Sequence, residues 1–212
     1  MDPENTVVGL CARGMAAEAA DRPSEARELF RQAWEAADDD YEACVAAHYL
    51  ARHQSTPEET LRWNLLCLER ADRVGDGRVL PFYPSLHGSL GRAHLELGQP
   101  NEARGHFESA AARLGDLPAG PYADWLRLRI AEGLRATGPA PTEPEPLRAL
   151  LEALCARADL ASLALLLPPY VEDLGRPEDA ERITGALRML HAERRLPPTE
   201  QAALAEVIGP RG

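Results

Sequence analysis

Small residues recur at fixed spacing in this 212-residue chain, at positions where two helices would have to touch. Between residues 89 and 110, Gly91 and Ala103 are small enough for two backbones to approach, Gly98 turns the chain, and Phe107 fills the gap between the helices. The pattern returns near the N-terminus and, more weakly, near the C-terminus, at Gly14, Asp21, Ala26, Phe30 and Ala33, and at Gly175, Ala180 and Leu187. A contact repeated in this way predicts stacked pairs of helices.

This spacing resembles the tetratricopeptide repeat, a helix-turn-helix unit of about 34 residues. The resemblance implies an all-α, right-handed α-solenoid of about three helix pairs, followed by a smaller C-terminal helical segment. We expect a small stand-alone bacterial member of this family, because the richness of the chain in Arg, Ala and Pro is typical of high-GC, actinobacterial genomes. Aromatic residues make up only 5% of the chain, which favours close helix packing over a β-sheet.

Proline and turn residues divide the chain into a helical solenoid (residues 1–137), a proline-rich linker (138–146) and a C-terminal helical segment or divergent repeat (147–212). Four prolines in the nine linker residues predict an extended conformation. The predicted helix pairs and the helix after them cover Thr6–Asp38, Tyr41–Val74, Tyr83–Leu114 and residues 122–136. The C-terminal helices are predicted near residues 147–158, 160–174, 177–194 and 199–207. Pro168 and Pro169 lie inside the second of these and should break or kink it.

The charge balance excludes one class of partner. The chain has 23 basic and 34 acidic residues and a net charge of −11, so it repels phosphate backbones and nucleic acid is not an expected partner. No stretch approaches the roughly 18 continuous apolar residues of a membrane span. The acidic start is not followed by an apolar run, so we expect a cytoplasmic protein without membrane contact. The four cysteines form no Cys-x-x-Cys pair, and we expect reduced, mostly buried thiols.

In the tetratricopeptide family, the inner helix of each pair lines a concave groove. The resemblance places on that groove the six residues predicted to bind a ligand, Met15, Tyr49, Arg52, His53, Ser85 and Arg92, together with Cys11, Glu18, Val45, Gly88 and Glu96. Helical spacing agrees for part of this set, because Val45, Tyr49 and Arg52 fall on one helix face.

Two arginines in an otherwise acidic protein define the expected ligand chemistry. Arg52 and Arg92 favour a carboxylate or phosphate, which a guanidinium can clamp through two hydrogen bonds. We therefore predict that the groove binds a peptide or protein segment with an acidic group, as an interaction scaffold with a regulatory role. The alternative is that these side chains pair with Glu18, Glu42 or Glu96 and are simply solvated.

A small-molecule-binding protein or enzyme of a bacterial biosynthetic pathway is the other functional class. Its pocket would combine a phenol, an anion holder and imidazoles, at Tyr49, Arg52, His53, Tyr83 and His87. The chain has no Gly-rich phosphate loop and no Gly-x-Ser-x-Gly motif. The sequence therefore predicts no catalytic residue and favours a non-enzyme.

The six histidines form no His-x-x-x-His or His-Glu-x-x-His pair. His87 and His94 share a helix face, but seven residues separate them by about 10 Å at about 1.5 Å per residue. That distance is too long for one metal ion unless a third element lies between them. The sequence predicts neither a metal nor a cofactor.

The second helix pair departs from the pattern of its neighbours, because His48 stands in the place of a glycine, Thr60 of an alanine and Asn64 of a phenylalanine. Either these three residues form an internal polar network, with neutral His48 bonding Asn64 or Thr60, or this pair packs differently. The outer helix also carries more apolar residues than one face can bury, and these pack on the next pair or form a homodimer surface. They are Leu61, Trp63, Leu65, Leu66 and Leu68.

Overall fold

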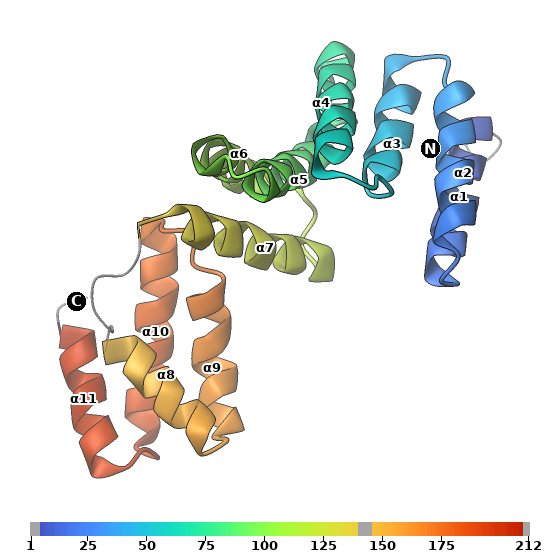
Figure 1. Ribbon diagram of the computed structural model, residues 1–212. Coiled ribbons are helices and arrows are strands. Elements are labelled where there is room, and N and C mark those ends of the chain that lie inside the picture. The colour runs from blue at the N-terminus through green and yellow to red at the C-terminus, as the bar shows by residue number, and fades with distance from the viewer. Residues whose placement is uncertain (1–4, 140–145, 210–212) are drawn as a thin grey trace. The chain divides into compact units, whose positions relative to one another are not determined.

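The computed structural model describes residues 5–139 and 146–209, and these residues form eleven α-helices, two short 3-10 helices and no strand (Figure 1). The prediction of an all-α protein is confirmed. The first seven helices are α1 (Thr6–Ala19), α2 (Pro23–Glu35), α3 (Asp40–Ala51), α4 (Pro57–Val74), α5 (Tyr83–Glu96), α6 (Pro100–Ala112) and α7 (Pro121–Thr137). The last four are α8 (Pro146–Ala156), α9 (Leu160–Val171), α10 (Pro177–Glu193) and α11 (Pro198–Ile208). The 3-10 helices are η1 (Leu80–Phe82) and η2 (Leu114–Asp116).

The chain divides into two compact units, Met1–Leu126 and Arg127–Gly212. In the first unit, helices pack in sequential pairs, α1 with α2, α3 with α4 and α5 with α6, and the α2–α3 and α4–α5 contacts join these pairs (Figure 1). In the second unit, α8 to α11 also pack in sequence, and α11 returns to contact α8. None of the described helices combines the length and the apolar character that crossing a bilayer requires.

The boundary between the units lies inside α7, whereas the sequence places a linker at residues 138–146. Side chains from the second half of α7 hold the loop after α9, since Arg127 Nε donates to the Glu172 carbonyl at 3.2 Å and Arg135 Nη2 to the Val171 carbonyl at 2.8 Å. These bonds group the second half of α7 with the second unit. Most of the expected linker, residues 140–145, lies outside the described residues.

Helix starts follow the sequence signals. The Thr56 hydroxyl accepts a hydrogen bond from the Glu59 amide at 3.2 Å, and Pro57 occupies the first helical position of α4, where a missing N–H costs nothing. The acidic run before α3 forms a turn and the start of the helix, because Asp39 accepts a hydrogen bond from the Glu42 amide at 2.8 Å. Asp40 then lies in the first turn, where the helix dipole favours negative charge.

Close contacts between glycine and phenylalanine hold the first and third helix pairs. A Cβ atom added to Gly14 would lie 2.7 Å from Cζ of Phe30, and one added to Gly91 would lie 2.9 Å from Cδ1 of Phe107. Both rings are buried. Gly14 and Gly91, two of the small residues singled out in the sequence, are therefore required by the packing of these pairs.

The buried side chains form separate clusters along the chain. One lies among α1, α2 and α3 around Phe30, and the next lies among α3, α4, η1 and α5 around Cys44 and Cys67. The two cysteine Sγ atoms are 3.6 Å apart, and both side chains are buried. The second unit has a core of its own, made largely of leucines: Leu147, Leu150, Leu151, Leu154, Leu166, Leu187, Leu190, Leu196 and Leu204.

Pro168 and Pro169 do not break their helix, so the first of the two expected effects is wrong, and the second, a kink, stays a prediction. Helix α9 continues through both residues and ends at Val171. The two prolines fall in its last turn, where each removes one backbone donor but little helix remains to be redirected. The Pro168 carbonyl still accepts a hydrogen bond from the Glu172 amide at 3.1 Å, which closes the helix.

Candidate functional site

The clearest polar cluster of the first unit joins α1 to the C-terminal end of α3. Glu18 lies on α1, and its two carboxylate oxygens contact Arg52 Nη2 and His53 Nε2, the latter at 2.7 Å. Arg52 follows the last residue of α3 as its C-cap, and His53 comes directly after it. A carboxylate is thus held by a guanidinium and an imidazole from a neighbouring helix.

Aromatic rings lie next to this ion pair. The guanidinium of Arg52 is 5.0 Å from the centre of the Tyr49 ring, a cation–π distance. The Tyr49 ring stacks on buried Phe30 at 5.1 Å between centroids, and His53 lies 5.3 Å from the same phenylalanine. Burial is the main cause that raises the pKa of Tyr49, so its phenol is neutral at ordinary pH. The cluster thus combines the Glu18 carboxylate, its guanidinium and imidazole partners, and the adjacent rings of Tyr49 and Phe30.

The structure brings Tyr49, Arg52 and His53 together, as predicted, but it also shows the alternative pairing that the sequence left open. Arg52 is paired with Glu18, and exposed Arg92 lies 3.9 Å from Glu96 on the same helix. The positive charge of the expected groove is therefore already partnered. An incoming acidic group would have to compete with these two glutamates.

The other predicted groove residues differ in exposure. Met15 on α1 is 40% exposed, which leaves its side chain accessible to a partner. Ser85 is buried, and its hydroxyl donates to the Phe82 carbonyl at 2.9 Å. The Ser85 hydroxyl thus has a backbone partner at the start of its own helix and is not presented to a ligand.

The expected network of His48, Thr60 and Asn64 does not form. Buried Asn64 donates to the backbone carbonyl of Thr60 at 2.9 Å, within helix α4. Among the described residues, His48 Nδ1 is buried without a hydrogen-bond partner, and the ring lies edge-on to Tyr49 and Phe82. Asn64 can satisfy its amide locally because the i−4 carbonyl of a helix is within reach. The sequence identified the polar positions but not this local solution.

Tyr83 and His87, the other half of the alternative pocket, have partners of their own. The Tyr83 hydroxyl donates to Asp72 at 2.8 Å, and burial together with this bond raises its pKa to about 12. His87 Nδ1 lies 3.1 Å from His106 Nδ1 of α6. These contacts hold Tyr83 and His87 on the α4–α5–α6 side of the unit.

The excess apolar residues of α4 are only partly covered. Trp63 packs edge-on against Trp34 of α2, with ring centroids 5.2 Å apart, and Leu68 packs against the second core cluster. Leu65 remains exposed. Part of this set therefore packs on neighbouring helices, but Trp63 does so on the preceding pair, whereas packing on the next pair was expected.

Glu18, the carboxylate that Arg52 and His53 hold, was one of the three pairing partners that the sequence left open. Two exposed aromatic residues were missed. Tyr122 and Trp125, at the start of α7, stack on each other at 5.9 Å between centroids and are 52% and 53% exposed. Burial is the largest of the influences that raise the pKa of Tyr49, and Tyr122 is the smallest. The sequence signal was a Tyr-x-x-Trp spacing directly after Pro121, which puts both rings on one helix face.

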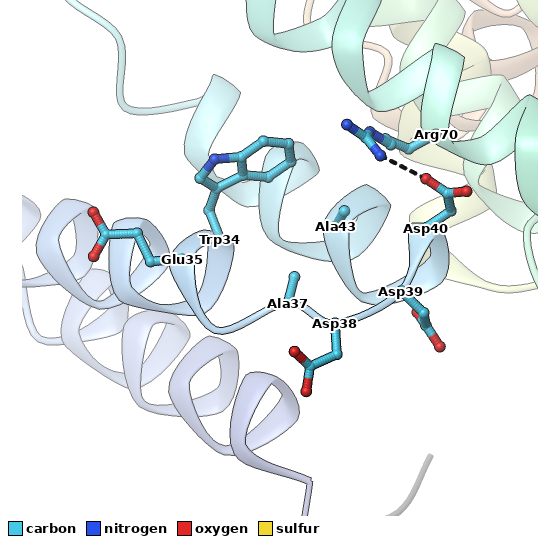
Figure 2. A pocket seen from close by; sticks show the side chains of 8 residues that line it. All are labelled: Trp34, Glu35, Ala37, Asp38, Asp39, Asp40, Ala43 and Arg70. Atoms are coloured by element: carbon cyan, nitrogen blue, oxygen red, sulfur yellow. Dashed lines mark hydrogen bonds and ion pairs between the residues drawn. The ribbon is translucent and has the colours of Figure 1, made fainter.

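A pocket of about 530 Å³ lies elsewhere, at the turn between α2 and α3, as Figure 2 shows. Arg70 pairs with Asp40 at 2.7 Å, and its guanidinium lies 5.9 Å from the centre of the Trp34 ring. Asp39 caps α3 from its side chain. The full lining is Trp34, Glu35, Ala37, Asp38, Asp39, Asp40, Ala43 and Arg70, and it includes none of the predicted groove residues. The carboxylates of Asp39 and Asp40 are engaged in a helix cap and an ion pair, and both contacts stabilise the turn.

Comparison of the chain with protein-family models, with curated proteins and with solved structures finds no match.

Proposed function

We propose that the first unit is a tetratricopeptide-like, right-handed solenoid that binds a peptide or protein segment carrying an acidic group. One observation carries the proposal: Arg52 and His53 hold the Glu18 carboxylate beside the Tyr49 ring. This arrangement has the chemistry of a carboxylate receptor, with charged donors and an aromatic wall. Glu18 stands where the acidic group of a partner would bind.

The packing of the unit supports the solenoid part of this proposal. Its helices pair in sequence, and the pairs α1–α2 and α5–α6 share the same contact of a glycine with a buried phenylalanine. Repetition of one contact at corresponding places is what a helical repeat requires, because each unit buries its apolar face on the next. The second pair lacks this contact and packs around Cys44 and Cys67.

Binding would proceed by exchange of one carboxylate for another. The guanidinium of Arg52 is accessible, with its side chain 45% exposed, so a partner can reach it from solvent. The partner's carboxylate would displace Glu18, while Tyr49 and exposed Met15, Tyr122 and Trp125 offer apolar contact to the flanking residues. A segment with an acidic residue next to an aromatic or aliphatic one fits these contacts best.

The test is a selection of random displayed peptides on the immobilised protein, followed by fluorescence-polarisation titration of the selected peptides. We expect enrichment of Asp or Glu next to an apolar residue. Arg52→Ala should weaken binding at least tenfold and Arg92→Ala more mildly, with melting temperatures nearly unchanged because both pairs are exposed. Glu18→Gln should strengthen binding, because it removes the internal competitor.

Arg148→Ala is the matched control, since Arg148 is also an exposed arginine paired with a glutamate four residues on, in the second unit. It should leave peptide binding unchanged. Selected peptides that bind Arg52→Ala as tightly as the unchanged protein would place the binding surface elsewhere.

A further inference from the structure

Three imidazole rings meet between α5 and α6. His87 and His94 lie seven residues apart on α5, and His106 of α6 lies between them. The Nδ1 atoms of His87 and His106 are 3.1 Å apart, and the His94 ring stacks on the His106 ring with centroids 5.2 Å apart. The sequence alone showed no third element between the two α5 histidines. The neighbouring helix α6 supplies one, His106.

A contact between two Nδ1 atoms has a specific chemical meaning. One ring must carry a proton on Nδ1 and the other must present a lone pair there, because two protonated nitrogens would repel. The same two nitrogens can each present a lone pair to a metal ion beside the line that joins them, once the donating ring moves its proton to Nε2 and both rings tilt toward the ion. Two nitrogens bound to one tetrahedral zinc ion at 2.0–2.1 Å lie about 3.3 Å apart. The observed 3.1 Å is within a few tenths of an ångström of that separation.

Burial, more than the surrounding charges, favours neutral rings in this pair, and neutral imidazole is the form that binds metals. Burial is the main cause that lowers the pKa of His87, with the Arg113 cation adding to it and Asp72 opposing it. Burial and the two neighbouring histidines lower the pKa of His106 to about 4. Arg113 itself lies 4.3 Å from the Tyr83 ring centre, and Tyr83 stacks against His87. At neutral pH both rings therefore offer uncharged nitrogen.

The helices hold the two rings in place before any ion arrives. Helices α5 and α6 pack closely through Gly91 and Phe107, and the His94 ring covers one face of His106. His94 itself is fixed by a 2.6 Å contact between its Nδ1 and Gln99 Oε1. A pair of ligands on two rigid, adjacent helices loses little conformational entropy on binding.

We propose that His87 and His106 bind a divalent transition-metal ion, of the class of Zn²⁺, Ni²⁺ and Cu²⁺, through their Nδ1 atoms. Imidazole nitrogen suits these ions, and Cu²⁺ should bind most tightly. Among residues 5–139 and 146–209, no three histidine, cysteine or acidic side chains converge on one point. Water therefore fills the remaining positions, and the ion exchanges readily with the solution.

The test is isothermal titration of the full chain, first treated with EDTA and dialysed, with NiCl₂, ZnCl₂ and CuCl₂ at neutral pH. We expect saturable binding of one ion per chain at this site and a higher melting temperature with each metal. His87→Gln and His106→Gln should each weaken binding at least tenfold and abolish the metal-dependent rise in melting temperature. His191→Gln, which removes a histidine from the second unit, is the control and should bind as the unchanged protein does.

Electron paramagnetic resonance of the Cu²⁺ form gives a readout that does not depend on variants folding well. Two equatorial nitrogens from imidazole are expected in the hyperfine pattern. The proposal is wrong if no saturable binding appears below about 1 mM metal. It is equally wrong if the copper spectrum lacks imidazole nitrogen, or if both variants bind as tightly as the unchanged protein.

Discussion

The Phe30 ring lies so close to Gly14 that a methyl group at position 14 would come within 2.7 Å of Cζ. The ring is buried and also stacks on Tyr49, so moving it would disturb that stacking. The contact thus links the packing of the first helix pair to the position of the Tyr49 ring in the candidate groove.

Gly14→Ala should destabilise the protein by about 1–3 kcal/mol, because the added methyl group overpacks the contact with Phe30. Gly9→Ala is the matched control in the same helix, since no atom lies within 4 Å of a Cβ placed there. That change should be neutral or stabilise by up to about 1 kcal/mol, as alanine favours helix. Urea denaturation measures both. Equal stability of the two variants would show that the Gly14 contact is not tight.

The sequence predicted helix pairing well because the signal is local and steric. Gly14, Gly91 and the two phenylalanines occupy contact points that only small and matching residues can share, so a spaced pattern predicts the contact. Thr56 and Asp39 are caps whose chemistry lies within four residues of each other in sequence. The tetratricopeptide assignment itself, and the handedness it implies, stay predictions.

The candidate site was harder to predict, because its partners lie far apart in sequence. Glu18 is 34 residues from Arg52, and His106 is 19 residues from His87. The first spacing equals about one repeat length, and the sequence offered Glu18 as one of three possible partners. The second spacing matches no repeat, so only the packed helices reveal the pair of His87 and His106. The predicted network around His48 was wrong for the opposite reason, because Asn64 bonds a nearer group, the Thr60 carbonyl of its own helix.

Stability should fall as the pH drops below the ordinary histidine range. Burial, with Arg52 as the second cause, lowers the pKa of His48 from 6.5 to about 4. Between those values the unfolded chain binds a proton that the folded chain does not, so the stabilisation is present above pH 6.5 and is lost progressively toward pH 4. His106 acts in the same direction.

His48→Phe isolates the contribution of His48 to that slope. The variant keeps a ring of similar size, cannot be protonated and removes the buried Nδ1 that has no partner among the described residues. Urea denaturation in EDTA, from about pH 7.5 to pH 5, should show a slope smaller by up to about 1.4 kcal/mol per pH unit. An unchanged slope would mean that His48 titrates normally.

Asp179→Asn should lower the free energy of unfolding of the second unit. Asp179 is 0% exposed, contacts Arg127 and accepts a hydrogen bond from the Leu174 amide at 3.1 Å. Removing its charge leaves a partly buried arginine without its closest partner, at a cost of about 3 kcal/mol. Glu152→Gln breaks an exposed pair with Arg148 and should cost less than about 0.5 kcal/mol. Thermal melts of both variants decide the matter, and similar melting temperatures would contradict the prediction.

Only one of the four cysteines should react with Ellman's reagent in the native protein. Cys155 is exposed, whereas Cys11, Cys44 and Cys67 are buried. Burial also raises the pKa of Cys11 to about 11 and that of Cys67 well above its usual value, so little thiolate is present. We expect one equivalent to react at neutral pH, none in Cys155→Ser, and all four thiols of the unchanged chain in denaturant. Fast reaction of more than one native thiol would show that a core opens readily.

The Glu18 carboxylate has a consequence for how binding would respond to salt. Docking of an acidic peptide on a free cationic surface weakens steeply as ionic strength rises, because attraction between unpaired charges is screened. At Arg52 and His53 the number of ion pairs is the same before and after a partner replaces Glu18. Affinity would therefore vary little with ionic strength, and discrimination among acidic partners would depend on the residues next to the carboxylate.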